Sequence, residues 1–185
     1  MQTLNISELN NGLPTITSAY GQEMAEAAAF CLTKNSHQSS NCILTCIKTL
    51  KNDTEDFQLF WDDLDPRVET TYSDLDEATE YGAMGIAILL SIKLTKSSTV
   101  VRSMKGTGID YWIGDKDGTM FQEKARLEIS GIFSGTDSQF NIRIRQKIKQ
   151  TNISDSSGFD CFVSIVEFSR PMSSFLSKKD NYGKN

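Results

Sequence analysis

Histidine and paired cysteines are scarce in this sequence. It has a single histidine, His37, and no Cys-x-x-Cys pair among its four cysteines. A zinc site or a histidine-dependent nucleophilic triad needs more of these residues, so neither class of enzyme is expected. Each cysteine stands in an apolar stretch, which is typical of buried free thiols. The four are Cys31, Cys42, Cys46 and Cys161.

Long apolar runs are also missing. No segment approaches the roughly 18 to 20 consecutive apolar residues of a membrane span, and residues 1–11 lack a basic region followed by an apolar one. We therefore expect a cytoplasmic protein without membrane contact. The 185 residues, 38% of them hydrophobic, suffice for a single domain with its own core. Residues 177–185 are polar and are expected to form a flexible tail.

An excess of positive charge is absent as well. The formal net charge is −5, which argues against a protein that coats nucleic acid by bulk electrostatics. The charge is uneven, however, because acidic residues crowd positions 55–80, whereas Arg143, Arg145, Lys147 and Lys149 share one short segment. A polyanion would have to approach this basic segment, and a basic partner would approach the acidic one.

Hydrophobic periodicity predicts an alternation of helices and strands. Residues 139–151 fit both a helical stripe and a strand alternation, and we favour the helix. The pattern Ser73-x-x-Asp76 resembles a capping box at the start of the longest helix, which is apolar or small nearly all round. The predicted helices are 18–32, 74–95 and 139–151, and the predicted strands are 41–50, 57–61, 99–103, 108–114, 124–133 and 159–168.

The order of these elements predicts the fold class. We expect an α/β (α+β) protein with a mixed central sheet flanked by helices. An N-terminal helix and hairpin, about residues 18–62, would precede a core at about residues 74–170. The whole chain, 1–185, would form one domain.

Two carboxylates on consecutive strands are the most suggestive chemical feature. The turn at 115–118 joins these strands, and a hairpin centred one residue after it places Asp110 directly opposite Glu128. Two such carboxylates repel each other unless a cation lies between them, and Mg²⁺ commonly binds one or two protein carboxylates. Alternation puts Glu128 on the same face as Arg126 and Ser130. This face is either a site of chemistry or the solvent-facing side of an ordinary sheet.

A third carboxylate, Glu80, lies on the long helix. It shares a helical face with Ala83 and Ala87, where a charge would be partly buried and would need a cationic partner. The alternative is an exposed side chain that interacts with the helix N-terminus and solvent. The basic segment at 143–149 would contact phosphates, supply a lysine to the carboxylates, or simply form a solvated face.

The order helix, three strands, helix, strand, with Asp110 on the second strand and Glu128 on the third, resembles the PD-(D/E)xK, or restriction-endonuclease-like, superfamily over about residues 74–170. The resemblance implies that Asp110 and Glu128 bind Mg²⁺ or Mn²⁺ and that Glu80 is similar to an assisting helix carboxylate. It implies a metal-dependent nuclease acting on DNA or RNA phosphodiesters, as in bacterial defence or repair. The stretch Lys-Gly-Thr-Gly-x-Asp-Tyr-Trp at 105–112 is similar to one in a set of uncharacterised bacterial proteins and implies no activity.

The lysine that the family places two residues after the glutamate is replaced here by Ser130. Lys124, Lys105 and Lys147 are candidates to take its place, and we favour Lys124 and Lys147 as catalytic residues. The alternative hypothesis is a non-catalytic, immunity-type protein of the same fold, whose acidic segment docks on a basic protein partner. The candidates for nucleic-acid contacts are Lys105, Arg126, Arg143 and Arg145.

Overall fold

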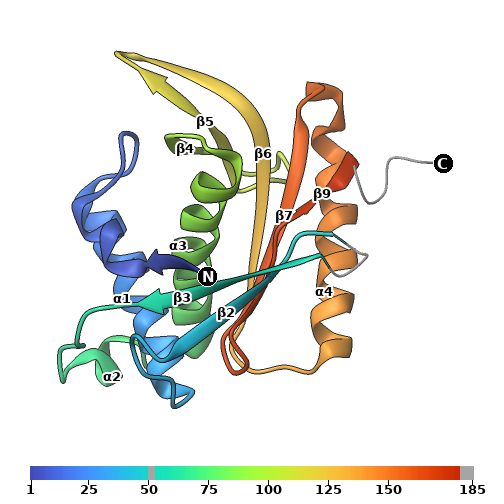
Figure 1. Ribbon diagram of the computed structural model, residues 1–185. Helices are drawn as coiled ribbons and strands as arrows, with labels where there is room; N and C mark the ends of the chain where they lie inside the picture. Colours follow the sequence, from blue (N-terminus) through green and yellow to red (C-terminus); the bar gives the residue numbers. More distant parts are fainter. Residues whose placement is uncertain (50–52, 180–185) are drawn as a thin grey trace.

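One mixed β-sheet lies between two helical layers (Figure 1). This is a computed structural model, and it describes residues 1–49 and 53–179. The strands are β1 (Gln2–Asn5), β2 (Cys42–Ile47), β3 (Thr54–Phe60), β4 (Thr99–Arg102), β5 (Tyr111–Asp117), β6 (Met120–Ile132), β7 (Asp160–Glu167), β8 (Met172–Ser174) and β9 (Leu176–Ser177). The helices are α1 (Ser18–Lys34), α2 (Val68–Thr71), α3 (Leu75–Thr95) and α4 (Asp137–Gln150), with 3-10 turns η1 (Ile6–Asn11) and η2 (Thr151–Ser157).

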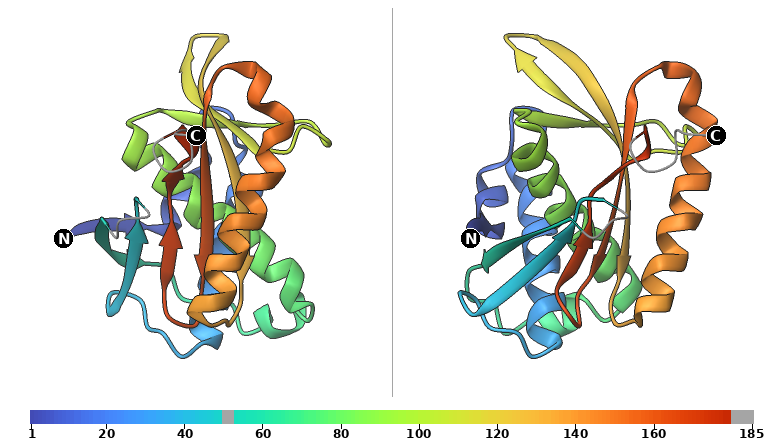
Figure 2. Two further views of the ribbon diagram at one scale, coloured as in Figure 1. Left: turned by 90° about the vertical axis from the view of Figure 1, so that its right-hand side faces the viewer. Right: turned by 45° about the vertical axis from the view of Figure 1, so that its right-hand side comes forward.

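The strand order is β1-β3-β2-β8-β7-β6-β5-β4, with β9 paired to β7. Helices α1 and α3 pack together on one face of this sheet, and α4 covers the other, as the two views of Figure 2 show. The expected fold class, a mixed sheet flanked by helices, is therefore confirmed. None of the helices in the described parts of the chain is long and apolar enough to cross a membrane.

The long helix α3 is buried because small residues let its neighbours approach closely. A Cβ at Gly82 would lie 3.0 Å from the backbone of Ala28 in α1, and one at Gly131 in β6 would lie 2.5 Å from the carbonyl oxygen of Thr79. The predicted helix is thus confirmed, but its cap lies one residue later than expected. The side chain of Asp74, not Ser73, accepts the backbone N–H groups of the first turn.

The N-terminal hairpin joins the same sheet as the rest of the chain. Strands β2 and β3 pair antiparallel as predicted, while β8 pairs parallel to β2 and connects it to β7. Their connection at 50–52 lies outside the described residues. Short strands β1, β8 and β9 were not expected from the sequence. In particular, the expectation of a flexible tail from Ser177 onward is wrong at its start, since Ser177 pairs with Phe162 and is buried, whereas 180–185 lie outside the described residues.

The hairpin of β5 and β6 is longer than predicted and carries a bulge. Its turn contracts to two residues, with Gly118 at a φ of 57°, so both strands extend toward it. Ile113 pairs with Ala125 and Gly114 with Glu123, which leaves Lys124 unpaired. Beyond this bulge Tyr111 pairs with Leu127. The register at the base of the hairpin is therefore the one that places Asp110 beside Glu128.

The ambiguous segment is the helix α4. Its N-terminus is a capping box in which the Thr136 side chain accepts from the Gln139 backbone and the Gln139 side chain accepts from Thr136. Phe140, Ile144 and Ile148 pack on β7, which confirms the helical stripe. The four cysteines are buried and free, also as expected.

Candidate functional site

Asp110 lies at the base of the β5–β6 hairpin, immediately before β5. The strand begins later than expected because Gly106 and Gly108 both have positive φ, which turns the chain. The backbone N–H of Asp110 donates to Leu127 at 2.9 Å, and its Oδ2 accepts from the backbone N–H of Ile129 at 2.8 Å. Both contacts hold the carboxyl group of Asp110 against the middle of β6.

Glu128 is completely buried and points from β6 toward α4. Its Oε1 accepts from Nζ of Lys147 at 2.6 Å and from Nε2 of Gln150 at 2.8 Å. Its Oε2 is buried and has no hydrogen-bond partner in the described part of the chain. Since a buried carboxylate oxygen without a partner is costly, this atom requires a proton or a cation.

The pKa of Glu128 reflects this environment. Burial raises it most, the neighbouring carboxyl group of Asp110 raises it as well, and the ammonium group of Lys147 opposes both, which leaves the pKa at about 7. At neutral pH the Glu128 carboxyl group is therefore divided between its protonated and its ionised form.

A groove of about 860 Å³ opens beside the pair. The first half of α3 forms one wall, with Asp76 and Glu80, and α4 forms the other, with Arg143 and Lys147. Asp110 lies among the lining residues, as do residues 129–134 at the end of β6. One wall is therefore acidic and the other basic, which suits a ligand that combines a cation with an anion.

Helix α4 separates the four predicted basic residues into two pairs. Arg143 and Lys147, four positions apart, share the face that lines the groove, whereas Arg145 and Lys149 are exposed and line no part of it. The guanidinium of Arg143 donates to Oγ of Ser130 at 2.7 Å. The residue at the family's lysine position is thus reached by a cation from the neighbouring helix.

The other two lysine candidates lie away from the carboxylate pair. Lys124, at the bulge, forms an ion pair with Asp115 of β5, and Lys105 is exposed in the turn before Asp110. Of the three candidates, Lys147 is the one that contacts Glu128.

Glu80 lines the groove but is exposed, so the expectation of a partly buried charge is wrong. Turned toward solvent in the second turn of α3, it needs no partner. The described residues contain no group of three or more histidine, cysteine or acidic side chains placed to hold a metal ion. A cation here would rest on Asp110 and Glu128, with Glu80 across the groove.

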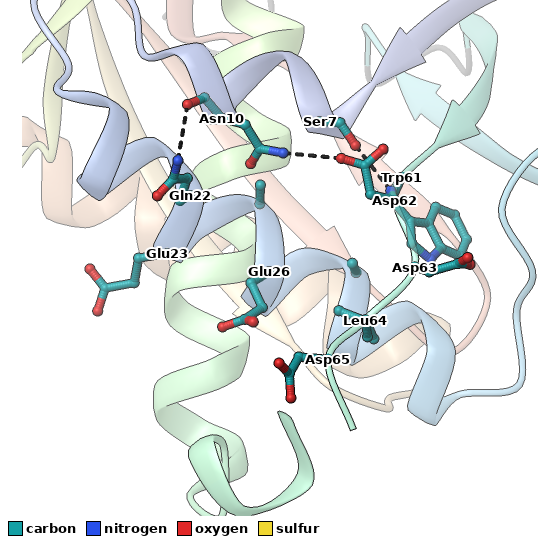
Figure 3. Close-up of a pocket in the computed structure, with 12 residues that line it drawn as sticks. Ser7, Asn10, Gln22, Glu23, Glu26, Trp61, Asp62, Asp63, Leu64 and Asp65 are labelled. Atoms are coloured by element: carbon teal, nitrogen blue, oxygen red, sulfur yellow. Dashed lines mark hydrogen bonds between the residues drawn. The ribbon is translucent and has the colours of Figure 1, made fainter. Parts of the chain in front are cut away.

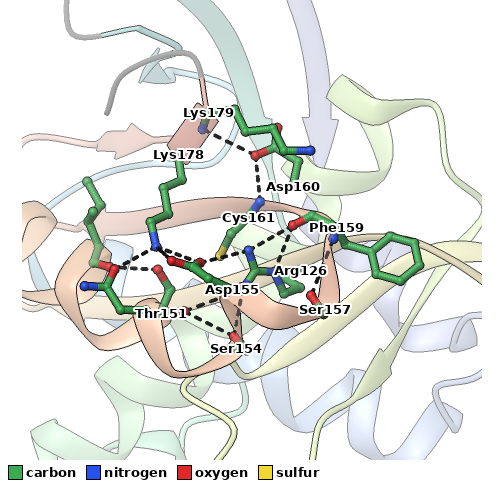
Figure 4. A network of polar contacts seen from close by, with 12 residues as sticks. Arg126, Thr151, Ser154, Asp155, Ser157, Phe159, Asp160, Cys161, Lys178 and Lys179 are labelled. Carbon is green, nitrogen blue, oxygen red and sulfur yellow. Dashed lines mark hydrogen bonds and ion pairs between the residues drawn. The ribbon is translucent and has the colours of Figure 1, made fainter. Parts of the chain in front are cut away.

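The side chain of Arg126 links β6 to η2 and to the residue before β7 and does not face outward (Figure 4). Its guanidinium donates to the carbonyl oxygen of Phe159 at 2.9 and 3.1 Å and to Oγ of Ser154 at 2.9 Å, and it pairs with Asp155. Only 4% of its side chain is exposed. The expected role in nucleic-acid contact is therefore not supported by its position. Alternation correctly predicts that Arg126 shares a face of β6 with Glu128, but the arginine is buried on that face.

Two residues near the pair were not foreseen. Gln150 is in the last turn of α4, and its contact with Glu128 depends on the packing of α4 across the sheet. Arg102, at the end of β4, lies close enough to Asp110 for the two charges to interact. The i, i+3 spacing of Lys147 and Gln150 is the only sequence signal that could have indicated the first of these.

A second cavity, of about 450 Å³, lies between α1 and the loop after β3 (Figure 3). Its acidic residues come from both segments, and the loop is tied to η1 by a hydrogen bond from Asn10 to Asp62 at 3.1 Å. These residues, here called the acidic pocket, are Glu23, Glu26, Asp62, Asp63 and Asp65.

Comparison of the chain with protein-family models, curated proteins and solved structures finds no significant match. The relationship to the PD-(D/E)xK superfamily therefore stays a prediction.

Proposed function

We propose that this protein is a divalent-metal-dependent nuclease whose active site is the groove between α3 and α4. The observation that carries the proposal is the buried Glu128 beside Asp110, with Oε2 unpartnered and Oε1 bound to Lys147. Asp110 and Lys147 line one groove that also has a basic wall, and Glu128 is buried directly behind them.

The residues present fit Mg²⁺ or Mn²⁺. Carboxylate oxygens are the ligands that Mg²⁺ prefers, and one or two from the protein are usual. Asp110 and Glu128 would hold the ion, through Oε2 of the glutamate. When bound, it supplies a nucleophilic water and neutralises charge on the phosphate.

The neighbouring cations would act on the phosphodiester. Lys147 holds Glu128 in place and brings a positive charge to the floor of the groove, where it would stabilise the charge that develops on the phosphate oxygens. Arg143, half-buried on the same wall, would bind a phosphate of the strand. Lys147 thus takes the role of the lysine that Ser130 replaces.

Cleavage assays test the proposal directly. Purified protein is incubated with single- and double-stranded DNA and RNA in Mn²⁺ or Mg²⁺, and then in EDTA. We expect metal-dependent cleavage by the wild type, and losses of at least about 100-fold in Asp110→Asn, Glu128→Gln and Lys147→Met. Asp63→Asn, in the acidic pocket, is the matched control and should cleave normally. Equal cleavage by wild type and Asp110→Asn would identify a contaminating nuclease and overturn the proposal.

The second candidate function is a binding protein for a basic partner, and the acidic pocket favours it. Asp65 is paired with Arg67, but the other four carboxylates around the cavity would attract lysine-rich segments, particularly at low salt. Titration with a lysine-rich peptide tests this, with Glu26→Lys as the variant and Glu8→Lys in η1 as its control. Absence of metal-dependent cleavage, together with binding that Glu26→Lys alone abolishes, would favour this function over the nuclease.

A further inference from the structure

A cluster of aromatic side chains and one arginine lies at the end of β4. The guanidinium of Arg102 donates to the hydroxyl of Tyr20 and lies 5.9 and 5.8 Å from the ring centroids of Tyr20 and Tyr111. The rings of Tyr20 and Tyr81 meet edge to face, 6.3 Å apart. Arg102 is exposed, and Tyr20 and Tyr81 are half-buried, so these three residues, here called the Tyr–Arg platform, form part of the surface.

Arg126 and Arg102 differ in how far protein contacts already occupy their guanidinium groups. Arg126 is buried, and its guanidinium is occupied by the carbonyl oxygen of Phe159, Oγ of Ser154 and the carboxylate of Asp155. The hydroxyl of Tyr20 is the only hydrogen-bond partner of the Arg102 guanidinium within the described residues. A guanidinium has five N–H groups, so an exposed one oriented by two aromatic rings retains donors for a ligand.

The platform adjoins the groove at Asp110. Arg102 pairs with Tyr111 across β4 and β5, and Tyr111 directly follows Asp110. Sδ of Met84 contacts the hydroxyls of Tyr20 and Tyr111 at 3.6 and 3.5 Å, and Met84 also lines the groove. A strand that crosses the groove would therefore reach the platform within a short distance.

The charges around Tyr81 indicate which part of a nucleotide would lie there. Glu23 and Glu77 are close enough for their negative charge to raise the pKa of Tyr81. This negative field disfavours a phosphate over the ring, whereas an uncharged base is unaffected. The phosphates would instead follow Arg102 and the basic wall of α4.

We propose that the Tyr–Arg platform stacks an unpaired base of a single-stranded nucleic acid whose backbone enters the groove at Asp110. Aromatic rings and arginine planes stack on any base, whatever its identity, but a base inside a duplex has both faces covered. The inference rests on the proposed nuclease function, since that function brings nucleic acid to the groove. It adds the substrate class: a single strand, or a single-stranded end or flap.

Binding measured in EDTA tests the platform without cleavage. The probes are a fluorescein-labelled 20-nucleotide thymidine strand and a duplex of equal length, and the readout is fluorescence anisotropy. We expect Tyr81→Ala to weaken binding of the single strand about tenfold, the size of one lost base stack, and Tyr81→Phe to bind normally. Duplex binding should not change. Arg102→Gln should also weaken single-strand binding, while Arg145→Gln, on the outer side of α4, is the matched control.

Each result supports or overturns one of the two proposals. Equal losses on single strand and duplex, a Tyr81→Phe variant as weak as Tyr81→Ala, or a wild type that does not bind the single strand would overturn the platform. Selective loss in Tyr81→Ala without any cleavage in Mn²⁺ would support the platform and overturn the nuclease. Cleavage of duplex alone, with no effect of Tyr81→Ala, would support the nuclease and overturn the platform. Circular dichroism checks the folding of each variant, and Arg102→Gln gives a second route if Tyr81→Ala is unstable.

Discussion

Nζ of Lys147 lies 2.6 Å from Oε1 of Glu128, although the two residues are 19 positions apart and belong to different layers. Lys147 is in the last turn of α4, so the contact requires the C-terminal end of this helix to pack against β6 next to Glu128. Gln150 completes the hydrogen bonding of the same oxygen. One oxygen of the buried carboxylate is thereby saturated, while the other remains without a donor next to Asp110.

Glu128 should make stability depend on pH. Its folded pKa, about 7, is raised above the ordinary value of 4.5, so the stability that it contributes is full below about pH 4.5 and is lost as the pH rises through 7. In EDTA, the unfolding free energy of wild type relative to Glu128→Gln should fall by about 3 kcal/mol between pH 4.5 and 8. Urea unfolding at five pH values measures it. A difference independent of pH would contradict the assignment.

Lys147→Met should destabilise the protein more at high pH than at low pH. At pH 5 Glu128 is protonated with or without the lysine, so the loss should be below about 1 kcal/mol. At pH 8 the variant has a buried carboxyl group without its cation, and the loss should reach about 1 to 2 kcal/mol. Lys149→Met, exposed on the same helix, is the control for helix propensity. Equal losses at both pH values would show that the lysine does not interact with ionised Glu128.

Divalent metal should stabilise the folded protein in the absence of any substrate. Mn²⁺ at a hundred times its Kd would add about 2.7 kcal/mol, a rise of several degrees in Tm at pH 8. The rise should vanish in Asp110→Asn and Glu128→Gln, and it should shrink at pH 5, where protons compete for Glu128. Differential scanning calorimetry provides the measurement. Glu23→Gln should respond as wild type does, and loss of the response in that variant would locate the metal in the acidic pocket instead.

Arg143 and Arg145 should differ in their effect on catalysis. Arg143 lines the groove and contacts Ser130, so Arg143→Ala should weaken substrate binding by roughly tenfold and reduce the salt dependence of KM. Arg145→Ala removes the same charge from an exposed position two residues away and should change KM less than about twofold. Steady-state cleavage at 50 and 200 mM salt compares them. Similar effects of both variants would mean that the helix attracts substrate only through its net charge.

Local pattern predicted the longer helices and strands, but neither their exact limits nor the short strands. The helical stripe of Phe140, Ile144 and Ile148 indicates α4, because residues four apart share a helical face. Strand β5 starts later than predicted because Gly106 and Gly108 adopt positive φ, which the apolar pattern does not record. The short strands β1, β8 and β9 were missed because a few residues carry too little periodicity, and their pairing partners are distant in sequence.

The amino-acid sequence by itself determined that Asp110 and Glu128 stand on consecutive strands joined by a tight turn. That turn alone would pair Asp110 with Leu127, and the bulge at Lys124 shifts the register by one residue and brings Asp110 beside Glu128. Only the tertiary structure decided which cations reach them. In the sequence alone, nothing distinguishes Lys147 from Lys124 and Lys105 as a partner of Glu128. The packing of α4 is what brings Lys147 to Glu128. Likewise η2 covers Arg126 whereas Arg102 is exposed, because burial depends on what lies over a strand and not on the strand's own residues.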